Sequence, residues 1–260
     1  MSHPLLSSSL LSLPPPPACV TSYTSNSKEY IHVRKDAKLD GSKPVSGGLA
    51  FCFPQFGPPS PEHEAKGLTM QQHGFARNLA WDVVESSDTS VTMSLSPSDY
   101  TKAMWDKDFS CTYSVAIGDD ELTTKFTVNN KGVDAFHFQG ALHSYFATDA
   151  KTTKIVGAFK GKEFLNKVKG EKETESRDEI IFAEEVDSVY QGISDFSVSS
   201  PDKTVSVAAK SGWTDFVAWN PFGDEGMGYE DFVCAESAVF EPLEVAGGGE
   251  WVGEMTLKPQ

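Results

Sequence analysis

The chain has 260 residues and a formal net charge of −15 at pH 7. Such an acidic surface repels nucleic acids and anionic membranes, so we expect neither as a partner. The composition includes 17 Phe, 7 Tyr and 5 Trp, and aromatic enrichment favours β-strands. The length suits one large all-β domain or two small domains, and it is enough to bury a substantial core.

No stretch of 18 apolar residues occurs, so the sequence predicts no transmembrane helix. The four cysteines are widely spaced, without a Cys-x-x-Cys motif or the spacing of metal ligands. Most lie in apolar, strand-like runs, where a thiol behaves as a small hydrophobe. We therefore expect reduced, structural cysteines and a cytoplasmic or plastid-stromal location. The cysteines are Cys19, Cys52, Cys111 and Cys234.

Residues 1–17 differ from the rest of the chain, because they are rich in Ser and Leu and end in four prolines, Pro14 to Pro17. Serines break the apolar run and no basic residue precedes it, which argues against a secretory signal. A transit peptide would be rich in both Ser and Arg, and residues 1–17 contain no Arg. We expect a disordered tail with polyproline II character, followed by a single domain over residues 18–260.

Strand patterns with turn residues between them recur along residues 18–260. Residues 111–117 alternate apolar and polar, residues 118–121 form a Gly- and Asp-containing turn, and residues 122–128 continue as a strand. This arrangement predicts a β-hairpin. Many short strands with regular turns predict an antiparallel sandwich or barrel. Further strand patterns cover residues 91–95, 205–209, 216–219, 232–235 and 251–257.

Helical signals are weak throughout the chain. We expect only short helical turns, near residues 98–105 and 162–166. Residues 160–185 are dense in charge, which could indicate a binding tail. Because the signs alternate, a solvated hairpin or loop is the favoured interpretation.

Two ionisable residues interrupt apolar, strand-like runs: His143 and Glu236. A buried ionisable group is costly unless it is paired or used, and His with Glu can supply an acid and a base at neutral pH. A core histidine bound to a backbone carbonyl is an equally good interpretation of His143, and His137 is expected to be structural. Gly140 allows a bulge between these two histidines. Glu236 could lie at a solvated strand end, but apolar residues resume at 238–240.

A second polar cluster lies at residues 71–78, which include His73 and Arg77. Arg77 is one of only three arginines, and it could form a surface ion pair. The concentration of amides, imidazole and guanidinium favours a sugar site, since sugars are held by planar groups with many donors and acceptors. The sequence lacks the motifs of nucleophilic hydrolases, zinc proteases and phosphate-binding loops. With these motifs excluded, we expect acid/base chemistry that does not use a metal.

Six motifs follow one another along the chain, at residues 47–57, 72–78, 141–146, 185–190, 217–222 and 233–236. In this order they resemble the motifs of the glucose-6-phosphate 1-epimerases, the hexose-6-phosphate mutarotases of the aldose 1-epimerase superfamily. The resemblance extends from about residue 19 to the C-terminus. It implies an antiparallel β-supersandwich of the galactose-mutarotase type. It also implies interconversion of the α and β anomers of a hexose 6-phosphate, with glucose 6-phosphate as the first candidate, without metal or organic cofactor. We expect the protein to be a monomer.

The resemblance also implies roles for individual residues. Glu236 would be the base and His143 the acid. His73 would hydrogen-bond the ring or anomeric region, and Asp187 would bind sugar hydroxyls. Arg77 would face the 6-phosphate, because a guanidinium suits a phosphate.

The chain departs from the family in two respects. Family members commonly carry Arg before the first Gly-Gly pair as a phosphate ligand, and here Ser46 occupies that position. The Ser46 hydroxyl, Lys43 or Lys66 could substitute for it, and Gln55 could contact the sugar or the loop. The one or two strands that usually begin the family fold are replaced by the Ser/Leu/Pro tail, so the sandwich could lack an edge.

Two alternatives follow. The Ser46 departure would suit a mutarotase of a neutral or differently phosphorylated sugar. A non-catalytic carbohydrate-binding or regulatory domain is disfavoured, because a binding site has no need of both His143 and Glu236.

Overall fold

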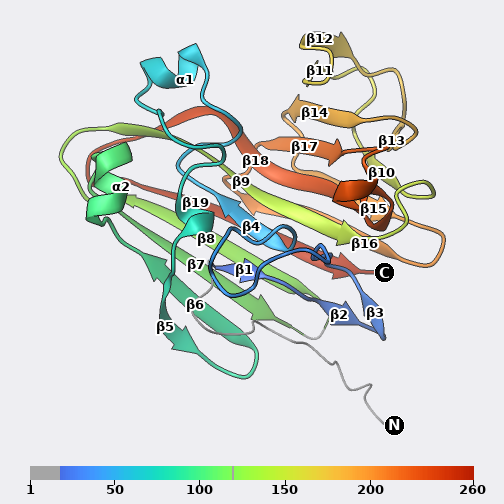
Figure 1. The fold of residues 1–260 in the computed structure, drawn as a ribbon, viewed down its shortest axis with the longest axis horizontal. Coiled ribbons are helices and arrows are strands. Elements are labelled where there is room, and N and C mark those ends of the chain that lie inside the picture. Colours follow the sequence, from blue (N-terminus) through green and yellow to red (C-terminus); the bar gives the residue numbers. More distant parts are fainter. Residues whose placement is uncertain (1–17, 119) are drawn as a thin grey trace.

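The computed structural model describes residues 18–118 and 120–260. The predicted disordered tail, residues 1–17, lies outside the described residues. Two large sheets dominate the structure, one of eight strands and one of nine, with a two-stranded ribbon beside them (Figure 1). All strand pairs in these sheets are antiparallel. The predicted antiparallel all-β fold is therefore confirmed.

The eight-stranded sheet carries β9 and β18 at its centre, and these are the two longest of its strands. Its order is β1 (Cys19–Val20), β4 (Leu49–Cys52), β9 (Phe136–Ala147), β18 (Phe232–Val245), β17 (Asp215–Asn220), β14 (Val186–Gln191), β11 (Glu163–Asn166), β12 (Glu171–Thr174).

The nine-stranded sheet packs against one face of the first. Its order is β13 (Glu179–Ile181), β10 (Lys154–Gly157), β15 (Asp195–Ser199), β16 (Thr204–Ser211), β19 (Glu250–Pro259), β8 (Leu122–Asn130), β7 (Phe109–Ile117), β6 (Ser90–Leu95), β5 (Asp82–Ser86). The ribbon pairs β2 (Thr24–Ser25) with β3 (Lys28–Glu29). The helices are short: α1 (Pro61–Ala65), α2 (Asp99–Met104) and the 3-10 turns η1 (Ala76–Asn78), η2 (Glu225–Met227) and η3 (Tyr229–Asp231).

The predicted hairpin is confirmed as β7 and β8, which pair along their whole length from Ile117 and Leu122. The predicted helical turn at residues 98–105 is confirmed as α2, which begins at a capping box formed by Ser98 and Thr101. Helix α1 was not predicted. It is too short for a periodic pattern, although Ser60 caps it and Pro61 occupies its first turn.

The predicted helical turn at residues 162–166 is wrong, because residues 163–166 form strand β11. Both edges of β11 are paired, with β12 on one side and β14 on the other, and its Phe164 is buried against Tyr190. Pairing and burial override a weak local signal. Within the charge-dense segment, residues 163–174 form the predicted hairpin, β11–β12, and its Lys169 and Lys172 are exposed. Glu175 of the same segment is buried instead.

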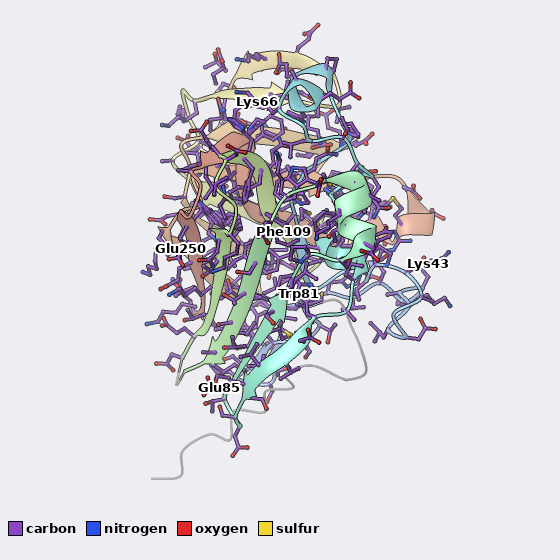
Figure 2. All side chains as sticks on the ribbon, turned by 90° about the vertical axis from the view of Figure 1, so that its left-hand side faces the viewer. Lys43, Lys66, Trp81, Glu85, Phe109 and Glu250 are labelled. Atoms are coloured by element: carbon purple, nitrogen blue, oxygen red, sulfur yellow. The ribbon has the colours of Figure 1, made fainter. Side chains whose placement is uncertain are left out.

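Aromatic side chains fill the space between the two sheets. Phe51 of β4 stacks on Phe126 of β8 with ring centroids 4.0 Å apart, and it meets Tyr113 of β7 edge-on at 4.3 Å. Figure 2 shows Phe109 inside this layer, whereas Glu85 lies at the periphery. Each fully buried Phe stabilises the fold by about 1.5–3 kcal/mol, so the aromatic composition supplies the core.

Strand alternation places a different set of side chains on the other face of the eight-stranded sheet. In β9, Leu142 and Phe146 belong to the core, so His143 and Tyr145 point to the opposite, outer face. The register gives Glu236 of β18 the same orientation, since it lies opposite Val217 of β17. The outer face thus collects the ionisable residues that interrupt the strands.

The expected irregularity near Gly140 lies mainly in the partner strand. The pairing of β18 with β9 shifts between Val239 and Leu243, so extra residues of β18 face Gln139. The Gln139 amide donates to the carbonyl of Phe240 in this bulge and lies 3.1 Å from Nε2 of His63 in α1. The bulge therefore anchors α1 at this end of the sheet.

The four cysteines are free and buried, as the apolar surroundings predicted. In the described parts of the chain, no helix is long and apolar enough to cross a membrane.

Candidate active site

A cavity of about 250 Å³ opens on the outer face of the eight-stranded sheet. Residues from β9, β14, β17 and β18 form its floor, and the loops at residues 56–77 and 167 form its walls. It brings together five residues singled out in the sequence: His73, Arg77, His143, Asp187 and Glu236. The remaining lining residues are Phe56, Gln72, Tyr145, Lys167, Val217, Trp219 and Met227.

His143 and Glu236 are in direct contact at the bottom of the cavity. Nδ1 of His143 lies 3.4 Å from Oε1 of Glu236, and the residues are 8% and 1% exposed. Neither His143 Nδ1 nor Glu236 Oε2 has a hydrogen-bond partner within the described parts of the chain. Unpaired buried polar atoms cost free energy, so this pair lowers the stability of the fold and is a candidate for a functional role.

The environment of the pair favours the uncharged form of each group. Burial raises the pKa of Glu236 well above its usual 4.5, and the charge of Asp187 adds to this effect. Burial lowers the pKa of His143 well below 6.5, with further lowering by His73, Arg77 and Lys167. These shifts favour a protonated Glu236 beside a neutral His143, so the pair holds one proton that either group can carry, as reversible proton transfer needs.

His73 presents a neutral donor to the cavity. The backbone N–H of Gly57 donates to its Nδ1 over 3.1 Å, which leaves the proton on Nε2. Burial, followed by the charges of Arg77 and Lys167, lowers the pKa of His73 to about 3. His73 has a φ of +64°, followed by Gly74 at +70°. A Cβ on Gly74 would lie 2.3 Å from the carbonyl oxygen of Phe53, so only glycine fits this turn.

Two cations reach the cavity. Arg77, in η1, makes only a long contact of 3.5 Å to the carbonyl of Gln72, and its Nε is buried without a partner. No carboxylate pairs with Arg77 in the described residues. The second cation, Lys167, holds Oδ2 of Asp187 at 2.9 Å. The guanidinium of Arg77 is thus free to bind an anion.

Aromatic side chains form one wall of the cavity. The ring of Tyr145 stacks on His143 at a centroid distance of 4.7 Å and an interplanar angle of 13°. Trp219 meets His143 edge-on at 5.8 Å. These rings orient the imidazole and offer an apolar surface beside the polar groups, the combination typical of small-molecule sites.

The structure places the other expected residues outside the cavity lining. Gln55 is fully buried and does not line the cavity, and its amide donates to the carbonyl of Gly57 over 3.1 Å, which is a loop contact. Ser46 is half-buried, and its carbonyl accepts from the backbone N–H of Arg34. Lys43 and Lys66 are exposed. Ser46, Lys43 and Lys66 were the expected replacements for the family arginine of the first motif. None of the three lines the cavity.

Lys167 is the residue that sequence reasoning missed. It lies in the charge-dense segment interpreted as solvated, and nothing in the local pattern separates it from its neighbours. Only the pairing of β11 with β14 brings it beside Asp187. His137, by contrast, lies outside the cavity lining and is 3.6 Å from Glu244.

One group of possible metal ligands occurs in the described residues, with donor atoms of His143, Cys234 and Glu236 within 4.8 Å of one another. Cys234 is fully buried, and burial raises the pKa of its thiol well above 9. Metal binding by cysteine requires the thiolate. This environment opposes a metal at that position.

A second hollow of about 180 Å³ adjoins the first and shares Met227 with it. Its cations are already compensated: Arg34 pairs with Asp36 at 2.9 Å, and Lys35 pairs with Asp231 at 3.2 Å. Arg77, which has no carboxylate partner in the described residues, and the pair of His143 and Glu236 all line the first cavity and not this second hollow.

The sequence profile of the aldose 1-epimerase family matches residues 18–260, and the chain belongs to this family. A relative from Cenchrus ciliaris, named "Putative glucose-6-phosphate 1-epimerase", is 29% identical over 92% of this chain and 78% of its own length. A relative from Escherichia coli K12 with the same name is 29% identical over 81% of this chain and 73% of its own.

Solved structures share the fold. The Slr1438 protein from Synechocystis sp. PCC 6803 superposes with a TM-score of 0.81 at 20% identity, over 94% of this chain and 90% of that one. A galactose mutarotase-like protein from Lactobacillus casei superposes with a TM-score of 0.77 at 15% identity, over 95% of this chain and 96% of that one. The galactose-mutarotase type of β-sandwich expected from the sequence is confirmed. The family defines the chain as an aldose 1-epimerase-type isomerase.

Proposed function

We propose that this chain interconverts the α and β anomers of a hexose 6-phosphate, with glucose 6-phosphate as the first candidate. One observation carries the proposal: the contacting pair of His143 and Glu236 shares its cavity with the uncompensated guanidinium of Arg77. The pair supplies acid/base chemistry, and the guanidinium suits a phosphate. The names of the relatives from Cenchrus ciliaris and Escherichia coli support the same substrate.

The proposed mechanism needs one proton on the pair, carried by His143 at the moment of reaction. Glu236 removes the proton from the anomeric hydroxyl while His143 protonates the ring oxygen. The C1–O5 bond then breaks, and C1 becomes the carbon of a free aldehyde. Rotation about C1–C2 exposes the other face of the aldehyde. Ring closure reverses both transfers, because Glu236 returns its proton to the new anomeric hydroxyl and His143 recovers its own.

The remaining residues would orient the sugar. Nε2–H of His73 would donate to the ring or anomeric oxygen, and the carboxylate of Asp187 would accept from sugar hydroxyls. Arg77 would bind the phosphate. Hydrogen bonds hold the ring of His73 and the carboxylate of Asp187 before substrate arrives, which reduces the entropic cost of reaching the transition state.

Anomer exchange measured by NMR tests the proposal, with glucose 6-phosphate and glucose compared in parallel. The proposal predicts faster enzyme-dependent exchange of glucose 6-phosphate, with a lower KM. A folded protein that exchanges neither sugar would refute it.

A second candidate, a mutarotase of neutral sugars, is favoured by the position of Ser46, which brings no charge to the cavity. Under this candidate glucose would exchange as well as or better than glucose 6-phosphate, so the same measurement separates the two.

A further inference from the structure

The turn after β11 inserts a lysine into the active-site cavity. Lys167 is the first residue beyond the strand, and its side chain is 28% exposed, against 59% for Lys169 and 69% for Lys172 in the same hairpin. Among these three lysines, Lys167 alone lines the cavity. Its side chain is therefore directed inward, although the segment around it is solvated.

Hydrogen bonds fix Lys167 at both ends of the residue. Its backbone N–H donates to the carbonyl of Asp187 over 2.8 Å, and its ammonium donates to Oδ2 of the same residue over 2.9 Å. The turn itself is closed by the N–H of Gly170, which donates to the carbonyl of Asn166 over 2.8 Å. Lys167 is thus positioned before any ligand binds, and little side-chain entropy remains to be lost.

Lys167 and Arg77 act on the same groups from different walls of the cavity. The charges of both side chains lower the pKa of His73 and His143 and oppose the rise in the pKa of Glu236. These side chains all line the same cavity. A sugar phosphate with its anomeric carbon at His143 and Glu236 would therefore have both cations in the cavity that holds its phosphate group.

The ammonium has bonding capacity left after its ion pair. An ammonium carries three N–H donors, and the contact with Asp187 uses one of them. A phosphate monoester carries a charge of about −1.5 to −2 at pH 7, more than Arg77 alone can balance. The ion pair of Lys167 with Asp187 adds no net charge to the cavity, so Lys167 would contribute its two remaining N–H donors to a phosphate, beside the charge of Arg77.

We propose that Lys167 is a specificity-determining residue that binds the phosphate group of the substrate together with Arg77. This inference rests on the proposed function, a hexose-6-phosphate mutarotase. Asp187 holds the ammonium in the cavity, and the two remaining N–H donors would bind the phosphate oxygens. The hairpin β11–β12, rather than the segment around Ser46, supplies the second cation.

The substitution Lys167→Met tests this role, with Lys169→Met as the matched control from the same turn. Lys169 pairs with Glu173 at 2.9 Å and does not line the cavity. Kinetic constants for anomer exchange are measured with glucose 6-phosphate and with glucose. We expect Lys167→Met to raise KM for glucose 6-phosphate roughly ten- to hundred-fold. KM for glucose should rise much less, because glucose loses only the orientation of Asp187. Lys169→Met should change neither constant.

Inorganic phosphate provides a second readout on the same variants. It should inhibit the wild-type enzyme competitively and inhibit Lys167→Met more weakly. Lys167→Arg, which keeps the charge, should retain most of the preference for glucose 6-phosphate. Thermal unfolding verifies that each variant is folded.

The outcomes separate this inference from the proposed function. If the wild-type protein prefers glucose 6-phosphate but Lys167→Met keeps that preference, the role of Lys167 is wrong and the proposed function stands. If Lys167→Met weakens both substrates equally, Lys167 acts only by aiming Asp187, and the inference also fails. A wild-type protein that shows no preference for glucose 6-phosphate refutes both.

Discussion

His143 and Glu236 touch because of the register between β9 and β18. Cys234 pairs with Tyr145 and Ser237 pairs with Leu142, so Glu236 lies opposite His143 on the outer face of the sheet. Nδ1 of His143 and Oε1 of Glu236 are 3.4 Å apart. A register shift of one residue would turn Glu236 into the core. The acid/base pair is therefore held by the backbone pairing of the two longest strands in the sheet.

His143→Gln should lower the rate of anomer exchange by roughly 100-fold or more, because positioned proton transfer contributes about that much. The matched control is His137→Gln, which changes a histidine of the same strand outside the cavity. Its exchange rate should equal that of the wild type. Exchange by His143→Gln at near wild-type rate, in a protein with unchanged melting temperature, would exclude His143 as the acid.

Arg77→Ala should raise KM for a hexose 6-phosphate by roughly ten- to hundred-fold or more, since a hydrogen bond to a charged group contributes about 1.5–3 kcal/mol. The effect on glucose should be smaller. Arg34→Ala serves as the control, because Arg34 pairs with Asp36 outside the cavity lining. An equal loss with both sugars would identify Arg77 as a structural residue and favour the neutral-sugar alternative.

The pH dependence of exchange should be bell-shaped, because the pair works only while it holds one proton. The acid limb reports protonation of His143, whose pKa is below 6.5, and the alkaline limb reports loss of the proton from Glu236, whose pKa is above 4.5. The charge of Asp187 raises the pKa of Glu236, so Asp187→Asn should move the alkaline limb to lower pH.

Asp178→Asn provides the control for this shift, because Asp178 pairs with Lys160 on the surface. Its pH profile should match that of the wild type. An alkaline limb that stays in place or moves upward in Asp187→Asn would contradict the electrostatic account of the pair.

Alternation of apolar and polar residues was enough to predict the antiparallel fold and the β7–β8 hairpin, and a weak helical signal located helix α2. It also identified His143 and Glu236, because charged residues within apolar strands are conspicuous in any sequence. Lys167 could not be identified in this way. Its position in the cavity depends on the pairing of β11 with β14 and on one ion pair to Asp187, and both are long-range features.

Long-range contacts also explain why the positions of Gln55 and of residues 162–166 could not be predicted from local sequence patterns. Gln55 belongs to a sequence motif, yet it is fully buried and its amide supports the loop, which only the fold reveals. Residues 163–166 have little strand character of their own and become β11 because strands pair on both sides.

The buried carboxylate of Glu175, the residue directly after β12, should make the free energy of unfolding depend on pH in acid. Glu175 is 3% exposed and accepts from Nε and Nη2 of Arg177 and from the hydroxyl of Tyr190 over 2.7–2.9 Å. Burial alone would raise its pKa, but these hydrogen bonds lower it from 4.5 to about 2. The stabilisation is therefore complete above pH 4.5 and is lost as the pH falls through about 2.

Glu175→Gln should lower the free energy of unfolding at pH 7 by about 1.5–3 kcal/mol, measured by urea denaturation. The loss should shrink between pH 4.5 and 2, where the wild type loses the same interaction. Glu163→Gln, which removes an exposed partner of Lys172, should change stability by less than about 0.5 kcal/mol. Equal effects of the two substitutions at pH 7 would contradict the assignment.

Saturation transfer between the anomeric protons of α- and β-glucose 6-phosphate is the most direct test of the proposed acid/base chemistry. The wild-type protein and Glu236→Gln are compared at equal concentration, with Glu244→Gln as a control from the exposed end of β18. We predict enzyme-dependent transfer with the wild type and Glu244→Gln, and a reduction of roughly 100-fold or more with Glu236→Gln. Equal transfer by the wild type and a folded Glu236→Gln would contradict the account.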